Sequence, residues 1–305
     1  MRHLLSILDL SSQEIAKIFE ISEQLKNGWK KGIREPLLER RVMGILFEKP
    51  SLRTRVSFEA AMTHLGGNSV FLDENVGWGK REPIQDFARV LTEYIDVLVF
   101  RGKNHLHAEQ LATYASCPVI NGLTDAAHPC QALADLYTLR EYHGDLKGKR
   151  IAFIGDANNV AASLAEACAR TGVEFAIASP AGYEFKPEFL AKLKQLEPAA
   201  SIVATRDPGE AVRGAIGVYT DVWVSMGQES EVAARAAAFK NYQVTANLMA
   251  RAAKGANFLH CLPARRGEEV TDEVIDGPQS VIVTQAANRM HVQKGVLAWI
   301  LGAKK

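Results

Sequence analysis

The chain has 305 residues and a formal net charge of +1, because 36 Lys and Arg residues stand against 35 Asp and Glu residues. Hydrophobic residues make up 47% of the sequence and charged residues 23%, as in an ordinary globular protein. The length predicts about two domains. The near-neutral charge gives no general reason for nucleic acid or a membrane as a partner, so we expect neither, and any anion site must be local.

The first strong pattern of the chain is a capping box, Ser11-Ser12-Gln13-Glu14, which predicts the start of a helix. An apolar run from Val42 to Phe47 then predicts a buried strand. Apolar residues at helical spacing from Phe58 to Leu65 predict the helix behind it. The intervening segment, Ser51 to Arg55, is therefore expected where a strand hands over to the N-terminus of a helix.

Such a handover suits an anion, because free backbone N–H groups and the positive end of the helix dipole collect there. The hydroxyls of Ser51 and Thr54 and the guanidiniums of Arg53 and Arg55 add donors. Arginine presents a planar fork of donors that matches phosphate or carboxylate oxygens. The alternative is an ordinary helix cap at Ser51 with solvated arginines.

Strands and helices alternate along the rest of the chain, which predicts an α/β fold in which each domain is a parallel sheet with helices on both faces. The polar segment Gly144–Lys149 marks a boundary between residues 1–143 and 144–287. Further strands are predicted at Ser69–Leu72, Asp96–Phe100, Pro118–Ile120, Arg150–Ile154, Glu174–Ala178, Ser201–Ala204, Ile216–Tyr219, Asn257–His260 and Val281–Val283.

Polar and basic residues follow three predicted strands of the first half: Ser51, Arg101 and the segment Asn121–His128. In parallel sheets ligands bind beyond the carboxyl ends of the strands, so these residues are expected at one rim. His128-Pro129 opens a helix on which Gln131 shares the face of His128. A helix cap or a core position is the alternative for His128.

Strand-end loops of the second half carry Asn158 and Asn159, and then Asp221 and Ser225. Together these side chains offer acceptors for an ammonium group and donors for a carboxylate, which suits a zwitterion. Ordinary turn chemistry is the alternative, because Asn, Asp and Ser are common in loops. Arg289 is expected at the start of the last helix, either as a third cation at the site or as a solvated surface arginine.

Five motifs in a fixed order make the chain resemble the aspartate and ornithine carbamoyltransferase family. The segment Phe47-x-Lys49-Pro50-Ser51-x-Arg53-Thr54-Arg55 is close to the carbamoyl-phosphate signature of that family. The other four motifs are His128-Pro129-x-Gln131, Asp221-Val222-Trp223-x-Ser225-Met226-Gly227, His260-Cys261-Leu262-Pro263 and Asn288-Arg289-x-His291-x-Gln293-Lys294. The Ser-Met-Gly segment is similar to the loop of the members that use ornithine.

The resemblance implies transfer of the carbamoyl group of carbamoyl phosphate to the δ-amine of L-ornithine, giving L-citrulline and phosphate, without a metal or an organic cofactor. It implies an arginine-biosynthesis or urea-cycle type step. The catalytic residues would be Arg53, Thr54, Arg101, His128, Asp221 and Cys261. The substrate-binding residues would be Ser51, Leu52, Gln131, Asn158, Asn159, Ser225, Met226, Leu262 and Arg289.

The family fold implies two α/β domains, the first binding carbamoyl phosphate and the second ornithine, joined by interdomain helices. The C-terminal helix, 288–305, would pack back on the first domain. The family also implies a homo-oligomer, a trimer whose active sites are shared between subunits. The loop Asp73–Pro83 takes the place of the segment that reaches a neighbour, with Lys80 and Arg81 as candidate phosphate contacts.

The sequence departs from the family pattern in three places. Leu52 stands where threonine is usual, which removes a hydroxyl from the phosphate loop and predicts weaker carbamoyl-phosphate binding. Arg265 replaces a usual histidine. Gln285 and Ala287 replace common acidic residues, which removes expected partners of Arg289.

Three other functions are open to the sequence. A sister carbamoyltransferase would act on putrescine, an N-acylated ornithine or aspartate, although the intact Ser225-Met226-Gly227 segment disfavours these. A nucleotide-binding dehydrogenase is suggested by Gly155 after a strand, but the later glycines are missing. A non-catalytic relative is suggested by Leu52.

The four cysteines Cys117, Cys130, Cys168 and Cys261 form no CxxC pair and no zinc-finger spacing, so free thiols are expected. The N-terminus lacks a long apolar run, and no stretch reaches transmembrane length. We therefore expect a cytoplasmic protein.

Overall fold

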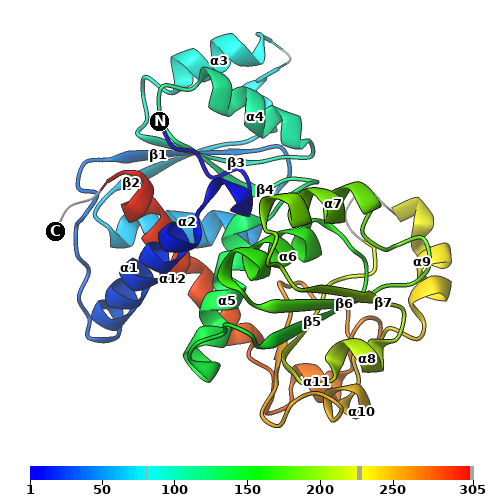
Figure 1. The fold of residues 1–305 in the computed structure, drawn as a ribbon. Coiled ribbons are helices and arrows are strands. Elements are labelled where there is room, and N and C mark those ends of the chain that lie inside the picture. Colours follow the sequence, from blue (N-terminus) through cyan, green and yellow to red (C-terminus); the bar gives the residue numbers. More distant parts are fainter. Residues whose placement is uncertain (80, 225–228, 303–305) are drawn as a thin grey trace. The chain divides into compact units, whose positions relative to one another are not determined.

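The computed structural model describes residues 1–79, 81–224 and 229–302, and the chain divides into two compact units (Figure 1). Unit 1 comprises residues 1–134 and 287–305, and unit 2 comprises residues 135–286. The chain therefore passes between the units twice. Two helices carry residues of both units: α5 (Pro129–His143) and α12 (Ile282–Ile300).

Unit 1 is built on a sheet of four parallel strands in the order β2-β1-β3-β4. The central strands β1 and β3 are apolar and buried, as expected for a parallel sheet covered by helices. The strands are β1 (Val42–Phe47), β2 (Asn68–Leu72), β3 (Val97–Arg101) and β4 (Val119–Leu123).

Helices connect the parallel strands of unit 1, because a parallel pair needs a crossover connection. The first long helix, α1, begins at the predicted capping box, where Ser11 and Glu14 cap each other reciprocally. Besides α5 and α12, the helices are η1 (Ile7–Asp9), α1 (Ser12–Lys30), α2 (Leu52–His64), η2 (Glu74–Val76), α3 (Ile84–Leu91) and α4 (His105–Tyr114).

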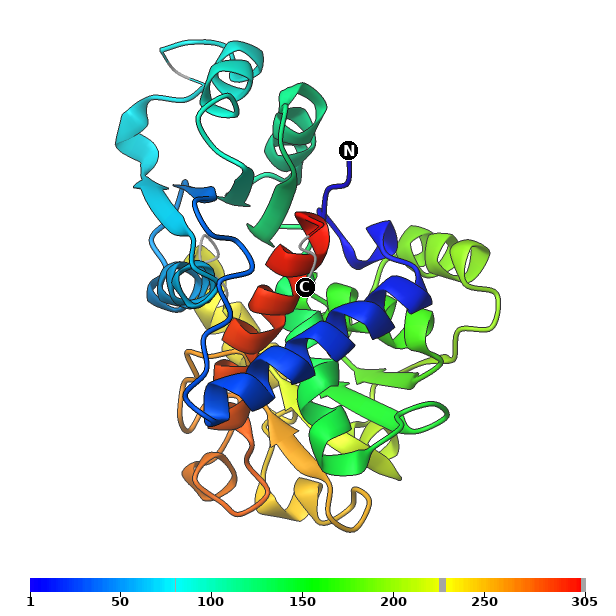
Figure 2. The ribbon, with the colours of Figure 1, turned by 90° about the vertical axis from the view of Figure 1, so that its left-hand side faces the viewer.

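The last helix packs closely on the first one within unit 1 (Figure 2). A Cβ atom on Gly295 of α12 would lie 2.1 Å from Ser22 Oγ and 2.7 Å from the Ile18 carbonyl oxygen of α1. Only glycine allows this approach. Val292 and Val296 of α12 are fully buried, so this face of the helix packs on the core.

Unit 2 is built on a sheet of five parallel strands in the order β7-β6-β5-β8-β9. Its core includes Ile154, Val218, Phe239 and Phe258, all fully buried. The strands are β5 (Arg150–Ile154), β6 (Glu174–Ala178), β7 (Ile202–Thr205), β8 (Ala215–Thr220) and β9 (Asn257–Leu259).

The helices of unit 2 again follow the strands in sequence. Asn158 caps α6 by accepting from two backbone N–H groups, and Asp207 caps the short α8 in a similar way. Besides α5 and α12, the helices are α6 (Asn159–Thr171), α7 (Pro187–Leu196), α8 (Pro208–Val212), η3 (Glu229–Glu231), α9 (Val232–Phe239), α10 (Ala246–Met249) and α11 (Asp272–Ile275).

The prediction of a two-domain α/β fold with parallel sheets is confirmed. The strand predicted at Val281–Val283 is wrong, because these residues open α12. A short β-branched run reads the same way in a strand and in a buried helix, and here the helical pattern continues for five turns. In the described part of the chain, no helix has the length and apolar character needed to cross a membrane.

Candidate functional site

Each sheet has one topological switch point, where the chain turns from one direction of the sheet to the other. In unit 1 the chain runs from β1 outward to β2 and then returns to β3 on the other side of β1. In unit 2 it runs from β5 out to β7 and returns to β8 beside β5. Ligands of open α/β sheets bind beyond the strand ends at such points.

In unit 1 the switch point brings the Ser51 loop beside Arg101. Phe47, the last residue of β1, pairs with Arg101, the last residue of β3. Ser51 is the N-cap of α2, and its Oγ accepts a hydrogen bond from the Thr54 N–H at 3.3 Å. The predicted strand-to-helix handover is therefore present. Arg101 lies inside the strand rather than after it.

Thr54 is the centre of a buried cationic cluster. Its Oγ1 accepts from Ser51 Oγ at 3.0 Å, from Arg101 Nη1 at 3.0 Å and from Arg289 Nη2 at 2.6 Å. Both arginines are buried, which rules out the solvated alternative for Arg289. The sequence predicts Arg289 at the start of the last helix, but Arg289 lies two turns inside α12. Two guanidiniums on one hydroxyl concentrate positive charge at this strand edge.

His128 is buried beside the same two arginines. Burial, and then the charges of Arg289 and Arg101, hold the pKa of His128 well below its usual range. The imidazole is therefore neutral near pH 7 and can act as an uncharged hydrogen-bond donor or acceptor. Gln131 is buried one turn along α5, so the predicted pairing of His128 with Gln131 near a helix start is present.

The remaining residues of the phosphate motif lie at the start of α2. Arg53 is half-buried, whereas Leu52 is 76% exposed. Arg55 differs from the expectation. Its Nε donates to Glu59 Oε1 at 3.0 Å, and its guanidinium lies 3.8 Å from the centre of the Phe71 ring. Arg55 is therefore engaged away from Thr54.

Asn121 also differs from the expectation, because it lies inside β4 and not in the loop after it. Its side chain is fully buried, and its amide nitrogen donates to the Leu5 carbonyl oxygen at 2.9 Å. It holds the N-terminal segment against the sheet. Asn121 is thus a structural residue of unit 1.

In unit 2 the switch point gathers hydrogen-bond donors around Asp221. Ile154 of β5 pairs with Thr220 of β8, so the loops after both strands start side by side. Asn158 Nδ2 donates to Asp221 Oδ2 at 2.9 Å, and Cys261 Sγ donates to Asp221 Oδ1 at 3.2 Å. Asn159 is half-buried at the first position of α6.

The segment after β9 forms a tight turn on His260. The Leu262 N–H donates to His260 Nδ1 at 2.9 Å, so the ring proton is on Nε2, which lies 3.1 Å from Glu269 Oε1. Leu262 has φ of +60°, an uncommon backbone conformation for a residue with a side chain. The turn thereby places Cys261 against Asp221.

Asp221, His260 and Cys261 offer ligand atoms within 4.8 Å of one another, a donor set that also suits zinc. Both ring nitrogens of His260 already face partners, the Leu262 N–H and Glu269. A metal would have to displace one of them.

Two contacts of unit 2 escaped the sequence reasoning. Arg235 Nη1 donates to Asp156 Oδ2 at 2.7 Å and to the Trp223 carbonyl oxygen at 2.9 Å, which ties the loops after β5 and β8 together. Glu269 is fully buried against His260. Their only sequence signal was charge in a predicted loop or helix, which is common on any surface.

The other residues singled out from the sequence are either exposed or lie outside the residues that the structure describes. Arg265 is exposed; its backbone N–H donates to Glu269 Oε1 at 2.6 Å, and its Nη1 lies 3.5 Å from Glu268 Oε2. Arg81 is exposed as well. Lys80, Ser225 and Met226 lie outside the described residues.

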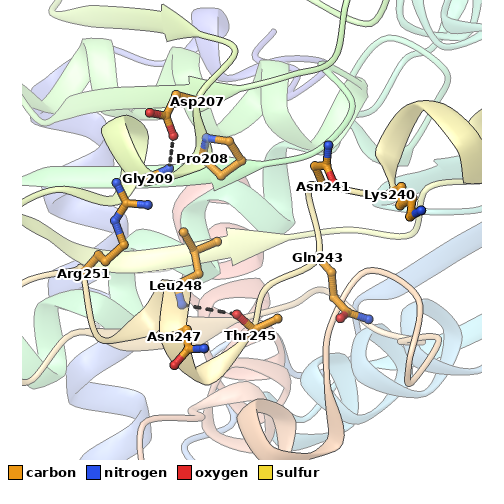
Figure 3. Close-up of a pocket in the computed structure, with 10 residues that line it drawn as sticks. All are labelled: Asp207, Pro208, Gly209, Lys240, Asn241, Gln243, Thr245, Asn247, Leu248 and Arg251. Carbon is orange, nitrogen blue, oxygen red and sulfur yellow. Dashed lines mark hydrogen bonds between the residues drawn. The ribbon is translucent and has the colours of Figure 1, made fainter.

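A surface hollow of about 430 Å³ lies elsewhere in unit 2 (Figure 3). There the Arg251 guanidinium lies against Gly209, and Asp207 caps α8. Its lining residues are Asp207, Pro208, Gly209, Lys240, Asn241, Gln243, Thr245, Asn247, Leu248 and Arg251, and none of them belongs to the predicted site.

Comparison with known families agrees with the motifs. The family model of the aspartate/ornithine carbamoyltransferase carbamoyl-P binding domain matches residues 2–141, and that of the Asp/Orn binding domain matches residues 147–300. The chain belongs to the aspartate/ornithine carbamoyltransferase family.

Within that family, the similar proteins are ornithine carbamoyltransferases. The one from Archaeoglobus fulgidus is 45% identical and that from Carboxydothermus hydrogenoformans 47% identical, each alignment covering 99% of this chain and 98% of the relative. A solved structure of ornithine carbamoyltransferase from Pyrococcus furiosus has a TM-score of 0.95 at 45% identity. The alignment covers 100% of this chain and 98% of the chain in that structure.

Proposed function

We propose that this chain transfers the carbamoyl group of carbamoyl phosphate to the δ-amine of L-ornithine, giving L-citrulline and phosphate. Full-length relatives that bear the name ornithine carbamoyltransferase support this choice over a sister enzyme for another amine. The observation that carries the choice is Asp221, a buried carboxylate held by Asn158 and Cys261, which suits an amine ligand.

Unit 1 is proposed to hold carbamoyl phosphate. Ser51, Arg53 and the N-terminus of α2 would bind the phosphate, with the backbone of Leu52. Arg289 would add a second guanidinium. Thr54, Arg101, His128 and Gln131 would face the carbamoyl group; the cluster on Thr54 supports this, because it orients two cations toward one strand edge.

Unit 2 is proposed to hold ornithine. Asp221 would accept from the amines, and Asn158 and Asn159 would donate to the carboxylate, together with Ser225 and Met226. Cys261 and Leu262 would contact the carbamoyl group beside the amine. The hydrogen bond from Cys261 to Asp221 supports a shared task for these two residues.

The reaction forms a C–N bond from the neutral δ-amine to the carbamoyl carbon and breaks the bond from that carbon to the bridging phosphate oxygen. Negative charge grows on the carbonyl oxygen, where Thr54, Arg101 and the neutral His128 would donate. The phosphate leaves with the electron pair of the broken bond and takes up the proton that the amine nitrogen loses. Ser51, Arg53 and Arg289 would stabilise its negative charge. Asp221 and Cys261 would orient the amine, and no cofactor enters these steps.

The test is citrulline formation by the purified protein from carbamoyl phosphate and L-ornithine. Putrescine, N-acetylornithine and aspartate run in parallel. We expect turnover with ornithine. Turnover with another amine in its place would overturn the assignment of unit 2, and no turnover with any of the four would favour a non-catalytic relative.

We further propose that the protein acts as a homotrimer in the cytoplasm. Leu52 and Val56 are exposed on one face of α2, and Val70 is exposed on β2, so apolar surface is left for a second copy of the chain. All four cysteines are free thiols, as a reducing compartment requires. Arg81 of the 73–83 loop would reach the site of a neighbouring subunit.

Mixed oligomers test the shared site. The variants Arg101→Met and Arg81→Ala, each impaired alone, are unfolded together, refolded and assayed, with light scattering for the mass. Recovered activity in the mixture is expected, because some sites then receive both native residues. A mixture that shows no more activity than the two variants alone, or a mass equal to that of the monomer, would contradict the proposal.

A further inference from the structure

Gln285 joins four elements of unit 2 through one buried side chain. Its Nε2 donates to Asp135 Oδ1 of α5 at 2.6 Å and lies 3.3 Å from the Tyr219 hydroxyl of β8. Its Oε1 accepts from the His260 N–H, directly after β9, at 3.0 Å. Gln285 itself lies in the first turns of α12 and is fully buried.

The buried Asp135 sets the orientation of this amide. A carboxylate accepts only, so the NH₂ end of Gln285 must face Asp135, and the oxygen must face the His260 N–H. Tyr219 also bonds to Asp135, and burial, followed by the charge of Asp135, raises the pKa of Tyr219 well above its usual range. Tyr219 therefore stays protonated and donates as well.

The accepted N–H belongs to the turn that carries Cys261 and Leu262. A residue other than glycine at positive φ persists only when its surroundings over-determine it. Two hydrogen bonds restrain the turn at Leu262. The Leu262 N–H donates to the His260 ring, and the His260 N–H donates to Gln285. Loss of the second restraint would let Cys261 move from Asp221.

We propose that Gln285 is a positioning residue: the hydrogen bond to Asp135 orients its amide, and the amide holds the 260–263 turn so that Cys261 stays on Asp221. The inference rests on the proposed function, in which this turn and Asp221 meet the reacting groups. Gln285 itself touches neither substrate.

A reciprocal swap tests the inference. Gln285→Glu keeps the acceptor for His260 but sets a second carboxylate beside Asp135, and Gln285→Leu removes both contacts. The double variant Asp135→Asn/Gln285→Glu restores one donor and one acceptor in reversed order. Gln279→Leu is the matched control, because the Gln279 side chain donates to the Ala256 carbonyl oxygen of the same unit and not to the 260–263 turn.

We expect Gln285→Leu and Gln285→Glu to lower kcat with ornithine at pH 8 by about tenfold or more. The loss in Gln285→Glu should shrink toward pH 6, where the two carboxyl groups can share a proton. The double variant should return to within about threefold of the native rate, and Gln279→Leu should match the native rate. A merely structural role would predict no rescue by the swap and no pH dependence of the loss.

The alkylation rate of Cys261 by iodoacetamide gives a second readout that needs no turnover. Cys117, Cys130 and Cys168 are buried, so Cys261 should label first. Gln285→Leu should change this rate by about threefold or more, and the swap should restore it. If the native protein lacks ornithine turnover yet the labelling pattern holds, the proposed function fails and the positioning role stands. Native kinetics and native labelling in both single variants would overturn the inference.

Discussion

The two units differ in the sign of the charges that they bury. Among the residues that the structure describes, the buried Asp, Glu, Lys, Arg and His side chains of unit 1 are all basic: Lys26, Arg101, His128, Arg289, His291 and Lys294. Unit 2 buries Arg235 and His260 but also four acids: Asp135, Glu166, Asp221 and Glu269. A buried charge is costly unless a partner of opposite sign meets it.

The difference matches the two proposed ligands. An interior rich in cations and donors suits a phosphate dianion, whereas an interior with a fixed carboxylate suits an amine. Charge variants of the two units should therefore affect different substrates.

The largest effect is expected from Arg101→Met, which removes a guanidinium from Thr54 and one donor to the developing oxyanion. Steady-state kinetics should show kcat/KM for carbamoyl phosphate lower by on the order of 10³. Arg89→Met, at an exposed arginine of unit 1, is the control and should stay native. A loss below tenfold would mean that Arg101 only fills space.

Asp221→Asn in unit 2 should raise KM for ornithine by roughly 10² because it removes the carboxylate that would accept from the amine. Calorimetric binding of carbamoyl phosphate should change less than about twofold. Asp145→Asn, which alters an exposed carboxylate of the same unit, serves as control. Equal weakening of both substrates would break the separation between the units.

His291→Gln should flatten the acid side of the stability profile. Burial, and then the charges of Lys294 and Lys26, lower the pKa of His291 to about 3. The unfolded chain protonates this ring near pH 6.5, so stability is present above that pH and is lost as the pH falls toward 3. At pH 4.5 the loss is about 2–3 kcal/mol.

Urea unfolding of both proteins at pH 7.5 and at pH 4.5 measures that difference. The comparison between the two pH values cancels the packing lost beside Trp29, whose ring centre lies 5.2 Å from that of His291. The same pH dependence in both proteins would show that unit 1 does not resist protonation at this buried base.

The smallest effect is expected from Leu52→Thr. Leu52 is exposed within one copy of the chain, so the substitution disturbs little packing inside that copy, and Leu52→Ala removes the same apolar contact with a second copy. The new hydroxyl would add one donor to the phosphate loop. The Kd for carbamoyl phosphate should fall by about threefold relative to Leu52→Ala. Equal affinities of the two variants would mean that side chains at this position do not reach the phosphate.

The sequence predicted those parts of the molecule that are determined locally. The capping box at Ser11 and the strand-to-helix transition at Ser51 depend on residues that are neighbours in sequence. Alternating strands and helices imply parallel sheets. Cys261 beside Asp221 also follows a simple rule, because both lie directly after strands of one sheet.

Long-range packing decided what the sequence could not. The local sequence left Arg289 open between a site cation and a surface arginine, because its partner, Thr54, lies 235 positions away. At position 285 the sequence showed only the absence of an acidic partner for Arg289. The structure shows that the Gln285 amide donates to Asp135, 150 positions earlier in the chain. The run Val281–Val283 fits a strand or a buried helix equally well until its neighbours are known.

The double passage of the chain between the units has a consequence for biosynthesis. Unit 2 is continuous in sequence and is complete once residue 286 has been made, whereas unit 1 also needs residues from 287 onward. The surface of α1 around Ile18 and Ser22, on which Gly295 packs, therefore stays uncovered during synthesis, although α1 is among the first elements made. A nascent chain should thus finish its second half before its first, and the cationic cluster on Thr54 should be the last part of the molecule to form.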